Sequence, residues 1–179
     1  MSDRPMRKVK NIHIFLLLLP LLPTAVKPLL PWRYNDSTSL PLGYYWKGDK
    51  EQAVKGSLVS FCLPREVASY AKARGYIGFG FCPGWAAMLL KPIAAVAGDV
   101  VEVQPEGVSI NGMLVPHTPV FALDSKERSH CYQFLGTHTV PQGYVFLLAP
   151  AHERSFDSRY WGWLPEDQIV ETLTEAWTW

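Results

Sequence analysis

The sequence predicts a mainly β domain, built from a bent or closed sheet with few short helices and preceded by an N-terminal transmembrane helix. Two observations predict the sheet. Apolar runs of strand length recur from residue 58 to residue 173, and turns rich in glycine and proline separate them. A third observation predicts the membrane helix, because a basic N-terminus precedes a long apolar stretch.

The predicted strands are runs in which apolar residues alternate or follow one another over strand-like lengths. They cover residues 58–63, 87–96, 100–103, 108–115, 144–149 and 168–173. Asn111-Gly112 lies at the centre of the fourth run, and this pair is the strongest short signal of a hairpin turn. One helix is predicted from Arg65 to Arg74, with Gly75 as its C-terminal stop.

Residues 12–32 are expected to anchor the chain in a membrane. They follow four basic residues and provide about the 20 residues that a helix needs to cross a bilayer. The basic flank predicts that residues 1–11 stay in the cytoplasm and that the domain at residues 33–179 lies outside the membrane. A cleaved secretory signal is an alternative, because the apolar core is short. A buried helix of a soluble protein is another, although four prolines would disrupt it.

Composition and cysteine usage narrow the classes of function. A formal net charge of +1 without a strong basic excess gives no sign of nucleic-acid binding. The three cysteines suit an oxidising compartment, and we hypothesise a disulfide between Cys62 and Cys82 that leaves Cys131 free. Three ordinary small apolar side chains are the alternative. No His/Cys cluster has the spacing of a zinc site, so we expect neither a metal nor a cofactor.

Lys91 is the most informative single residue, because it interrupts an apolar strand between Leu90 and Pro92. A lysine with its ordinary pKa of about 10.4 is protonated and cannot act as a base. Burial disfavours the charged form, and a pKa lowered by about three units would give a usable base at neutral pH. On pattern alone, a lysine whose amine reaches out to water is the commoner case.

Ser39 lies in a short loop, residues 35–43, that follows the predicted anchor. A neutral lysine would take the proton of its hydroxyl, which would then attack a carbonyl and form an acyl-enzyme. The backbone N–H of Ser39 and the hydroxyl of Ser37 are candidate donors to the oxyanion. Pro41 and Gly43 would shape the turn. Taken alone, such serine-rich loops are mostly only loops.

A third polar segment, residues 155–162, follows the apolar run at residues 144–149. Asp157 and Arg159 are expected to form a charge-assisted pair that makes this turn rigid. Ser155 is expected to form a hydrogen bond with the lysine amine and so aim it. A structural turn with one surface ion pair is the alternative.

Together, and in this order, the three segments resemble the type I signal peptidase family. The resemblance rests on Ser39-Leu-Pro, on Leu90-Lys91 through Gly98-Asp99, and on Ser155-x-Asp157-Ser-Arg159-Tyr-Trp-Gly162. Finer features resemble its TraF-like branch of conjugative transfer peptidases. These include Asn35-x-Ser-x-Ser39-Leu-Pro-x-Gly43, Arg74-Gly-Tyr76, Cys82-Pro-Gly84 and the terminal Trp177-Thr-Trp179.

The resemblance implies a membrane-bound serine endopeptidase with a signal-peptidase-like fold, in which Ser39 is the nucleophile and Lys91 the general base. The oxyanion and supporting residues would be Ser37, Ser155, Asp157 and Arg159. The TraF-like branch implies processing of a pilin precursor in plasmid conjugative transfer, with cyclisation of the product in some members. It places the chain in a bacterial inner membrane with its domain in the periplasm. The partners would be the precursor, the lipid bilayer and other conjugative transfer proteins.

Several alternatives stay open. A general type I signal peptidase that removes export signal peptides would use the same dyad. A Ser39–His152–Asp157 triad is the nearest chemical rival. Self-cleaving repressor-type Ser/Lys proteins are a further option, although they lack an anchor. A noncatalytic scaffold of a conjugative secretion channel would be marked by loss of the serine or the lysine, and both are present.

Three further stretches of the sequence bear on the site. Ordinary signal peptidases begin the closing box with Gly-Asp-Asn, whereas Ala149-Pro-Ala stands here. The stretch at residues 117–138 has no counterpart in that family pattern and is expected either to shape a substrate groove or to be a plain loop. Tyr44, Tyr45 and Trp46 are expected either to enter the headgroups of the membrane or to pack in the core.

Overall fold

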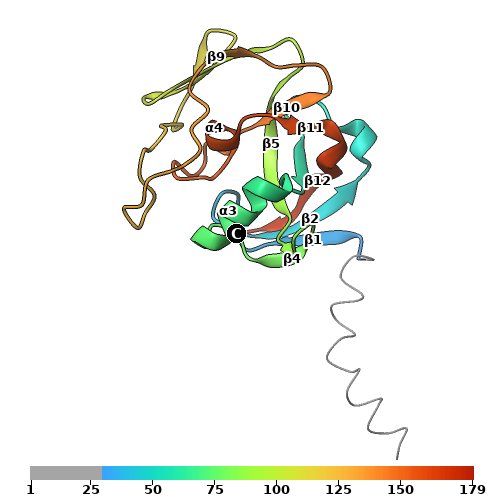
Figure 1. Cartoon of the computed structure of the whole chain (residues 1–179). Coiled ribbons are helices and arrows are strands. Elements are labelled where there is room, and N and C mark those ends of the chain that lie inside the picture. The colour runs from blue at the N-terminus through green and yellow to red at the C-terminus, as the bar shows by residue number, and fades with distance from the viewer. Residues whose placement is uncertain (1–29) are drawn as a thin grey trace, which may run out of the picture. The chain divides into compact units, whose positions relative to one another are not determined.

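The computed structural model describes residues 30–179, and Arg33–Trp179 form one compact unit (Figure 1). The predicted anchor at residues 12–32 lies outside the described residues, except for its last three. Across residues 30–179, no helix combines the length and the apolar character that crossing a bilayer requires. The membrane span therefore stays a prediction from the sequence.

Seven strands form the main, curled sheet in the order β1-β2-β12-β3-β5-β10-β11. Their bounds are Trp32–Asn35 for β1, Gly43–Gly48 for β2, Ile169–Thr178 for β12, Leu58–Phe61 for β3, Leu89–Val96 for β5, Tyr144–Leu147 for β10 and Leu164–Pro165 for β11. The first half of β5 pairs antiparallel with β3 and the second half with β10. Lys91, which is paired with Val59 of β3, thus lies on an interior strand of this sheet.

A smaller sheet of four strands has the order β8-β7-β6-β9. Its strands are Met113–Val115 (β8), Gly107–Ile110 (β7), Val100–Gln104 (β6) and Gly136–Thr139 (β9). The predicted hairpin is confirmed, because β7 and β8 are joined at Asn111 and Gly112, which have φ values of 52° and 78°. A φ of this sign is what a two-residue hairpin turn requires. Figure 1 shows this sheet at the end of the unit opposite β1 and β4 (Phe79–Cys82).

The predicted helix is confirmed as α3, Arg65–Arg74, and it ends at Gly75 in the left-handed conformation with φ 74°. Its buried residues, Ala68 and Ala71, pack into the main hydrophobic cluster. A second helix, α4 at Ser158–Trp161, was not predicted because a single turn is too short to show helical periodicity. Two short 3₁₀ helices, η3 at Lys50–Gln52 and η4 at Glu166–Gln168, complete the unit.

Strand β10 divides the interior into two hydrophobic clusters. Val145 and Leu147 belong to the cluster of the main sheet and α3, whereas Phe146 and Leu148 belong to the cluster of the smaller sheet. This alternation follows from the two-residue period of a strand. Phe156 packs against both clusters, so the segment after β10 lies where the two halves of the domain meet.

Two sequence expectations change in the structure. Strand β12 runs to Thr178 rather than ending near residue 173, because its second half pairs with β2. Tyr45 is fully buried and its hydroxyl donates a hydrogen bond to the Pro41 carbonyl at 2.7 Å. A headgroup contact is therefore wrong for Tyr45, although its neighbour Trp46 is exposed.

A disulfide joins Cys62, just beyond β3, to Cys82 at the end of β4, and Cys131 is free and exposed. The two bonded cysteines are 20 residues apart in the sequence. The bridge closes a loop that contains all of α3, and it ties this helix and the following hairpin to the main sheet.

Replacing both bonded cysteines with alanine is expected to lower the free energy of unfolding by about 3 kcal/mol, since loop closure restricts the unfolded chain. Chemical denaturation of the detergent-solubilised full chain, followed by circular dichroism, measures the change. Cys131→Ala is the matched control and should leave the unfolding midpoint in place. A midpoint that is equal in wild type and C62A/C82A would contradict a structural role for the bridge.

Candidate active site

Asn35 organises the loop that carries Ser39, between β1 and β2. Its buried side chain accepts a hydrogen bond from the Ser37 N–H at 3.1 Å and donates to the carbonyls of Ser37 at 2.9 Å and Pro41 at 3.0 Å. The Tyr45 hydroxyl holds the same Pro41 carbonyl from the core side. Sequence reasoning did not assign this role to Asn35, although an asparagine two residues before a turn is a familiar local signal.

The two predicted oxyanion donors lie side by side and are bonded to each other. The Ser37 hydroxyl donates to the Ser39 Oγ at 3.3 Å, and the Ser39 N–H donates to the Ser37 Oγ at 3.4 Å. Both distances are at the long end for such bonds, so an incoming carbonyl oxygen would compete well for these donors. The arrangement suits stabilisation of an oxyanion beside Ser39.

Ser39 opens onto a pocket of about 290 Å³. Its lining combines residues of the serine loop, of the turn after α3, of the stretch at residues 117–138 and of the closing segment. They are Ser37, Thr38, Ser39, Gly75, Tyr76, Phe121, Asp124, Ser125, His130, His152, Arg154, Ser155, Phe156 and Tyr160. Three of the predicted site residues, Ser37, Ser39 and Ser155, therefore meet at one pocket.

Part of the stretch at residues 117–138, which had no counterpart in the family pattern, forms one wall of this pocket. Asp124 is buried and accepts hydrogen bonds from the Tyr76 hydroxyl at 2.7 Å and from the Arg128 Nε at 2.8 Å. Burial, aided by donation to Asp124, raises the pKa of Tyr76 to about 12, so this hydroxyl stays protonated. The His130 ring lies 4.4 Å from the ring of Tyr160. The sequence left open whether the stretch at residues 117–138 shapes a groove or is a plain loop; in the structure part of it lines the pocket and contacts the turn after α3.

The Lys91 side chain is 4% exposed. Because successive side chains of a strand point to opposite faces, Lys91 faces the same side of β5 as Ile93. Burial lowers the pKa of Lys91 from 10.5 to about 8; the Asp157 carboxylate opposes this shift, and the Arg159 guanidinium adds to it. Roughly one amine in ten is then neutral at pH 7. The expected burial of Lys91 is confirmed, and a lysine that reaches out to water is excluded.

Asp157 and Arg159 form an ion pair in which both side chains are fully buried, so the alternative of a surface pair is wrong. Arg159 Nε lies 2.8 Å from Asp157 Oδ1, and Asp157 Oδ2 accepts from Arg159 Nη2 at 3.0 Å and from the Ala149 N–H at 3.1 Å. Arg159 Nη1 donates to the carbonyls of Pro119 and Glu153, each at 2.9 Å. The pair thus ties the end of β10 to two separate loops.

Ser155 and His152 differ in how they relate to this ion pair. The Ser155 Oγ is buried and forms no hydrogen bond within residues 30–179, so its expected bond to the Lys91 amine is not made.

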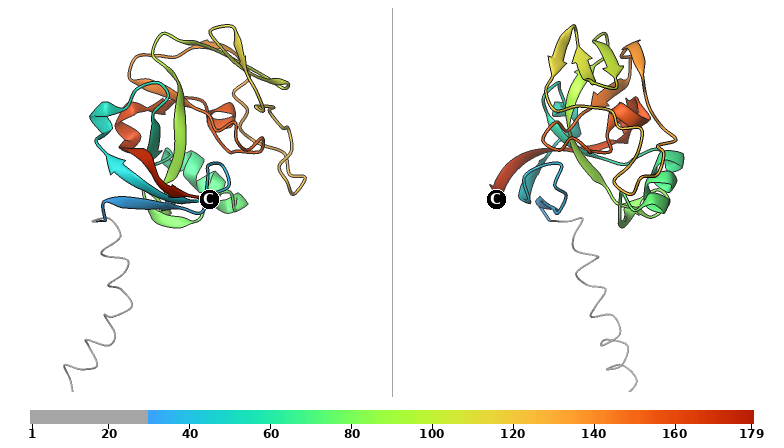
Figure 2. Two further views of the ribbon diagram at one scale, coloured as in Figure 1. Left: turned by 180° about the vertical axis from the view of Figure 1, so that it is seen from behind. Right: turned by 90° about the vertical axis from the view of Figure 1, so that its left-hand side faces the viewer.

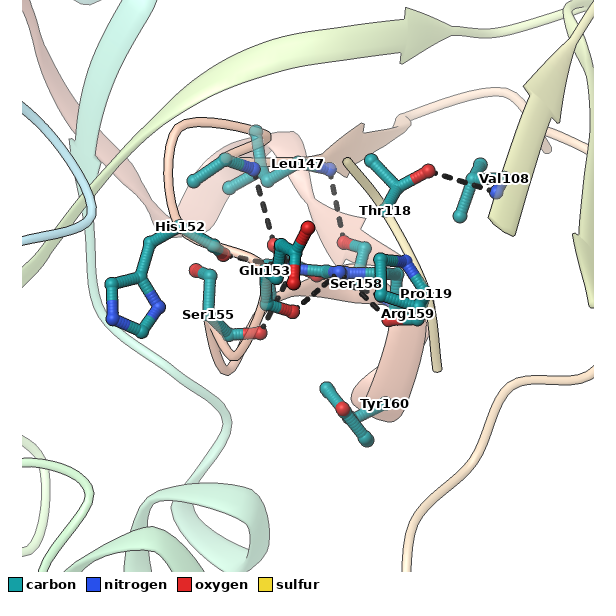
Figure 3. Close-up of polar contacts among 12 residues, drawn as sticks. Val108, Thr118, Pro119, Leu147, His152, Glu153, Ser155, Ser158, Arg159 and Tyr160 are labelled. Atoms are coloured by element: carbon teal, nitrogen blue, oxygen red, sulfur yellow. Dashed lines mark hydrogen bonds and ion pairs between the residues drawn. The ribbon is translucent and has the colours of Figure 1, made fainter. Parts of the chain in front are cut away.

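Both oxygens of Asp157 are bonded to Arg159 or Ala149, and the His152 ring points away from the cluster around Ser155 and Arg159 (Figure 3). This geometry disfavours the triad, because an aspartate that orients a histidine must accept its N–H.

The predicted site residues form two groups. Ser37, Ser39 and Ser155 line the pocket, whereas Asp157 and Arg159 are buried and act electrostatically on Lys91. Ser155 belongs to the turn held by the ion pair, since its carbonyl accepts from Arg159 Nη2 at 3.2 Å. Direct contact between the Lys91 amine and the Ser39 hydroxyl stays a prediction.

Comparison with known proteins places the chain among peptidases. A family profile described as signal peptidase, peptidase S26, matches residues 12–179. The chain belongs to this family. It is 36% identical over 148 residues to the plasmid transfer protein TraF of Escherichia coli, which covers 82% of this chain and 83% of that protein. It is 41% identical over 152 residues to a probable conjugal transfer protein TraF of Sinorhizobium fredii, with 82% and 77% covered.

Membership of the S26 family implies a serine peptidase, and the predicted resemblance to signal peptidases and to TraF proteins is confirmed. The predicted mainly β class is confirmed by the structure itself, with its curled sheet and few helices. A signal peptidase I structure from Enterococcus faecalis V583 is 22% identical and has a TM-score of 0.38, covering 68% of this chain and 96% of that one.

Lys91→Met is expected to stabilise the folded protein at pH 7 by up to about 3 kcal/mol, because it removes a buried amine whose pKa is lowered. Between pH 8 and 10.5 the unfolded wild type binds more protons than the folded form, so the stability of the wild type rises with pH. The advantage of the variant should therefore shrink over that range. Denaturant unfolding at pH 7 and pH 10 measures both effects.

Lys126→Met, at an exposed position, is the control and should show neither effect. A Lys91→Met protein that is less stable than wild type at pH 7 would mean that the Lys91 ammonium is well paired when charged.

Proposed function

We propose that the chain is a membrane-bound serine endopeptidase in which Ser39 is the nucleophile and Lys91 the general base. The observation that carries the proposal is the burial of Lys91, which lowers the pKa of its amine to about 8. A lysine can act as a general base near neutral pH only when its pKa is lowered in this way. Family membership supports the same assignment, because serine peptidases of this family need a nucleophile and a base.

The neutral Lys91 amine takes the proton from the Ser39 hydroxyl as its Oγ attacks the carbonyl carbon of the substrate. The carbonyl oxygen becomes an oxyanion and accepts hydrogen bonds from the Ser39 N–H and the Ser37 hydroxyl. The tetrahedral intermediate then collapses, the peptide C–N bond breaks, and the Lys91 ammonium returns its proton to the leaving amine. An acyl-enzyme on Ser39 remains, and either water or a peptide amine releases it.

We propose a pilin precursor as the substrate and plasmid conjugative transfer as the process. The names of the relatives, a plasmid transfer protein and a probable conjugal transfer protein, support the process, and the pilin precursor follows from the resemblance to TraF-like peptidases. The predicted anchor at residues 12–32 would hold the chain in a bacterial inner membrane with residues 33–179 in the periplasm. Other conjugative transfer proteins and the lipid bilayer are its further partners.

Two alternatives give different results in the same experiment. A general signal peptidase would cleave many exported precursors and release linear products to water. A noncatalytic scaffold of a secretion channel would cleave none. The retention of both Ser39 and Lys91 favours an enzyme over the scaffold.

Co-expression with a candidate pilin precursor tests the proposal by intact mass measurement. The wild type is expected to give a shortened product, and a product lighter than the linear form by one water would show cyclisation. Ser39→Ala and Lys91→Ala are expected to give only the precursor, because either change removes the dyad. His152→Ala is the control and should process the precursor as the wild type does. Processing by Ser39→Ala would refute the proposed nucleophile.

The rate of acylation at Ser39 is expected to rise with pH and to level off above about 8, where Lys91 becomes neutral. Below that value the rate should fall by about tenfold per pH unit, because only the neutral amine accepts a proton. Rapid-mixing measurements with a short peptide ester provide the profile. His152→Ala should give the same curve, whereas an inflection that disappears in this variant would assign the base to histidine.

A further inference from the structure

One arginine of the pocket beside Ser39 has no acidic partner among the described residues. Arg154 lines this pocket and is an exposed residue. Its Nη1 donates to the Leu123 carbonyl at 3.4 Å, which is long for such a bond, and no carboxylate pairs with it within residues 30–179. Because a guanidinium has five N–H donors, most of those of Arg154 are available to a ligand.

An aromatic ring holds the Arg154 guanidinium in place. The guanidinium carbon lies over the Phe121 ring, 4.2 Å from its centre. Phe121 lines the same pocket, and its N–H donates to the Tyr160 hydroxyl at 3.2 Å. A guanidinium that stacks on an aromatic face keeps its N–H groups in its own plane, where two of them can bind a carboxylate together. Arg154 is therefore pre-organised to receive a planar anion.

The charge of the neighbouring wall also favours an anion. Asp124 is the one carboxylate among the described residues that line the pocket, and two other arginines already offset its charge. Arg128 Nη2 lies 2.7 Å from Asp124 Oδ2, and Arg74 Nη1 lies 3.6 Å from the same oxygen. Arg154 adds a further positive charge to the lining. The pocket therefore has an excess of positive charge, which attracts a negatively charged ligand.

The loop at residues 121–131, which carries this wall, is braced against α3. It extends from the smaller sheet to the C-terminal end of this helix, as the two further views show (Figure 2). Arg128 Nη2 donates to the Arg74 carbonyl at 2.9 Å, and the Cys131 N–H donates to the Tyr70 hydroxyl at 3.1 Å. A ligand thus meets a wall that is already formed, which lowers the cost of ordering it on binding.

We propose that Arg154 binds a carboxylate of the substrate peptide and so selects precursors with an acidic group near the scissile bond; this inference rests on the proposed peptidase function. Arg154 and Ser39 line one pocket of about 290 Å³. Since an extended chain advances about 3.3 Å per residue, the carboxylate lies within roughly three residues of the scissile bond. It belongs either to an acidic side chain or to the C-terminus of the substrate, because both present the same planar pair of oxygens.

Paired peptides test this preference in the detergent-solubilised full chain. Each peptide carries the cleavage junction of the pilin precursor, with either Glu or Gln at one position within that distance of the scissile bond. A further pair ends in a free carboxylate or in an amide. We expect one acidic peptide to be cleaved with a kcat/KM about tenfold higher than its uncharged partner, as for a charge-assisted hydrogen bond. Preference for an internal Glu assigns an acidic side chain, and preference for the free end assigns the terminal carboxylate.

Variants of Arg154 show whether this residue carries the preference. Arg154→Met is expected to bring the ratio of the paired kcat/KM values to about one, and Arg154→Lys should keep part of the preference. Arg154→Glu should reverse it, so that the uncharged partner, or a peptide with Lys at the selected position, is cleaved faster. Loss of a purely structural arginine would not cause this reversal. Arg65→Met, which removes an exposed arginine of α3 that does not line the pocket, is the control and should leave the ratio unchanged.

Binding to the Ser39→Ala protein separates this proposal from the peptidase function, because it requires no cleavage. Titration calorimetry with the same peptide pairs is expected to show about tenfold tighter binding of the acidic peptide. The difference should shrink at high salt, since Arg154 is exposed and salt screens exposed charges.

The two measurements fail in distinguishable ways. Equal affinities within every pair, or binding of no peptide, would overturn the carboxylate site whether or not the wild type cleaves the peptides. A preference that Arg154→Met retains would also overturn it, since another residue would then carry the selection. Tighter binding of an acidic peptide that the wild type does not cleave would support the site and refute the peptidase.

Discussion

The buried ion pair between Asp157 and Arg159 holds together the parts of the molecule on which the site depends. Its hydrogen bonds reach the end of β10, the turn at residues 152–155 and the carbonyl of Pro119. Removing one partner of such a pair leaves a buried charge without compensation and typically costs about 3–5 kcal/mol. The pair is thus a structural clamp that also sets the electrostatic surroundings of Lys91.

The state of Lys91 follows from a competition between burial and charge. Burial disfavours the ammonium and has the largest effect on its pKa, whereas the nearby Asp157 carboxylate favours the charged form. Because Arg159 already neutralises Asp157, the carboxylate only partly offsets the effect of burial on the pKa of Lys91. The clamp therefore leaves the pKa of Lys91 at about 8. Loss of Arg159 would free the Asp157 carboxylate and so raise the pKa of Lys91.

Local signals in the sequence predicted the elements whose geometry is local. Helix α3 and its glycine stop are confirmed to the residue, and the Asn111-Gly112 turn is where the hairpin signal placed it. The second half of β12 and the single turn of α4 were missed, since the first depends on pairing with β2 and the second is shorter than one period of any pattern. The inward direction of Tyr45 likewise depends on what covers that face of β2.

By itself, the sequence determined the family, the order of the three boxes that carry Ser39, Lys91 and Asp157, and the mainly β class. These are properties of residue type and spacing along the chain. Only the tertiary structure decided that Lys91 is buried, that the Asp157–Arg159 ion pair is fully buried, and that part of residues 121–130 forms a wall of the pocket beside Ser39. Burial and electrostatic environment depend on segments far apart in sequence, and a chain read in one dimension does not contain the distances between them.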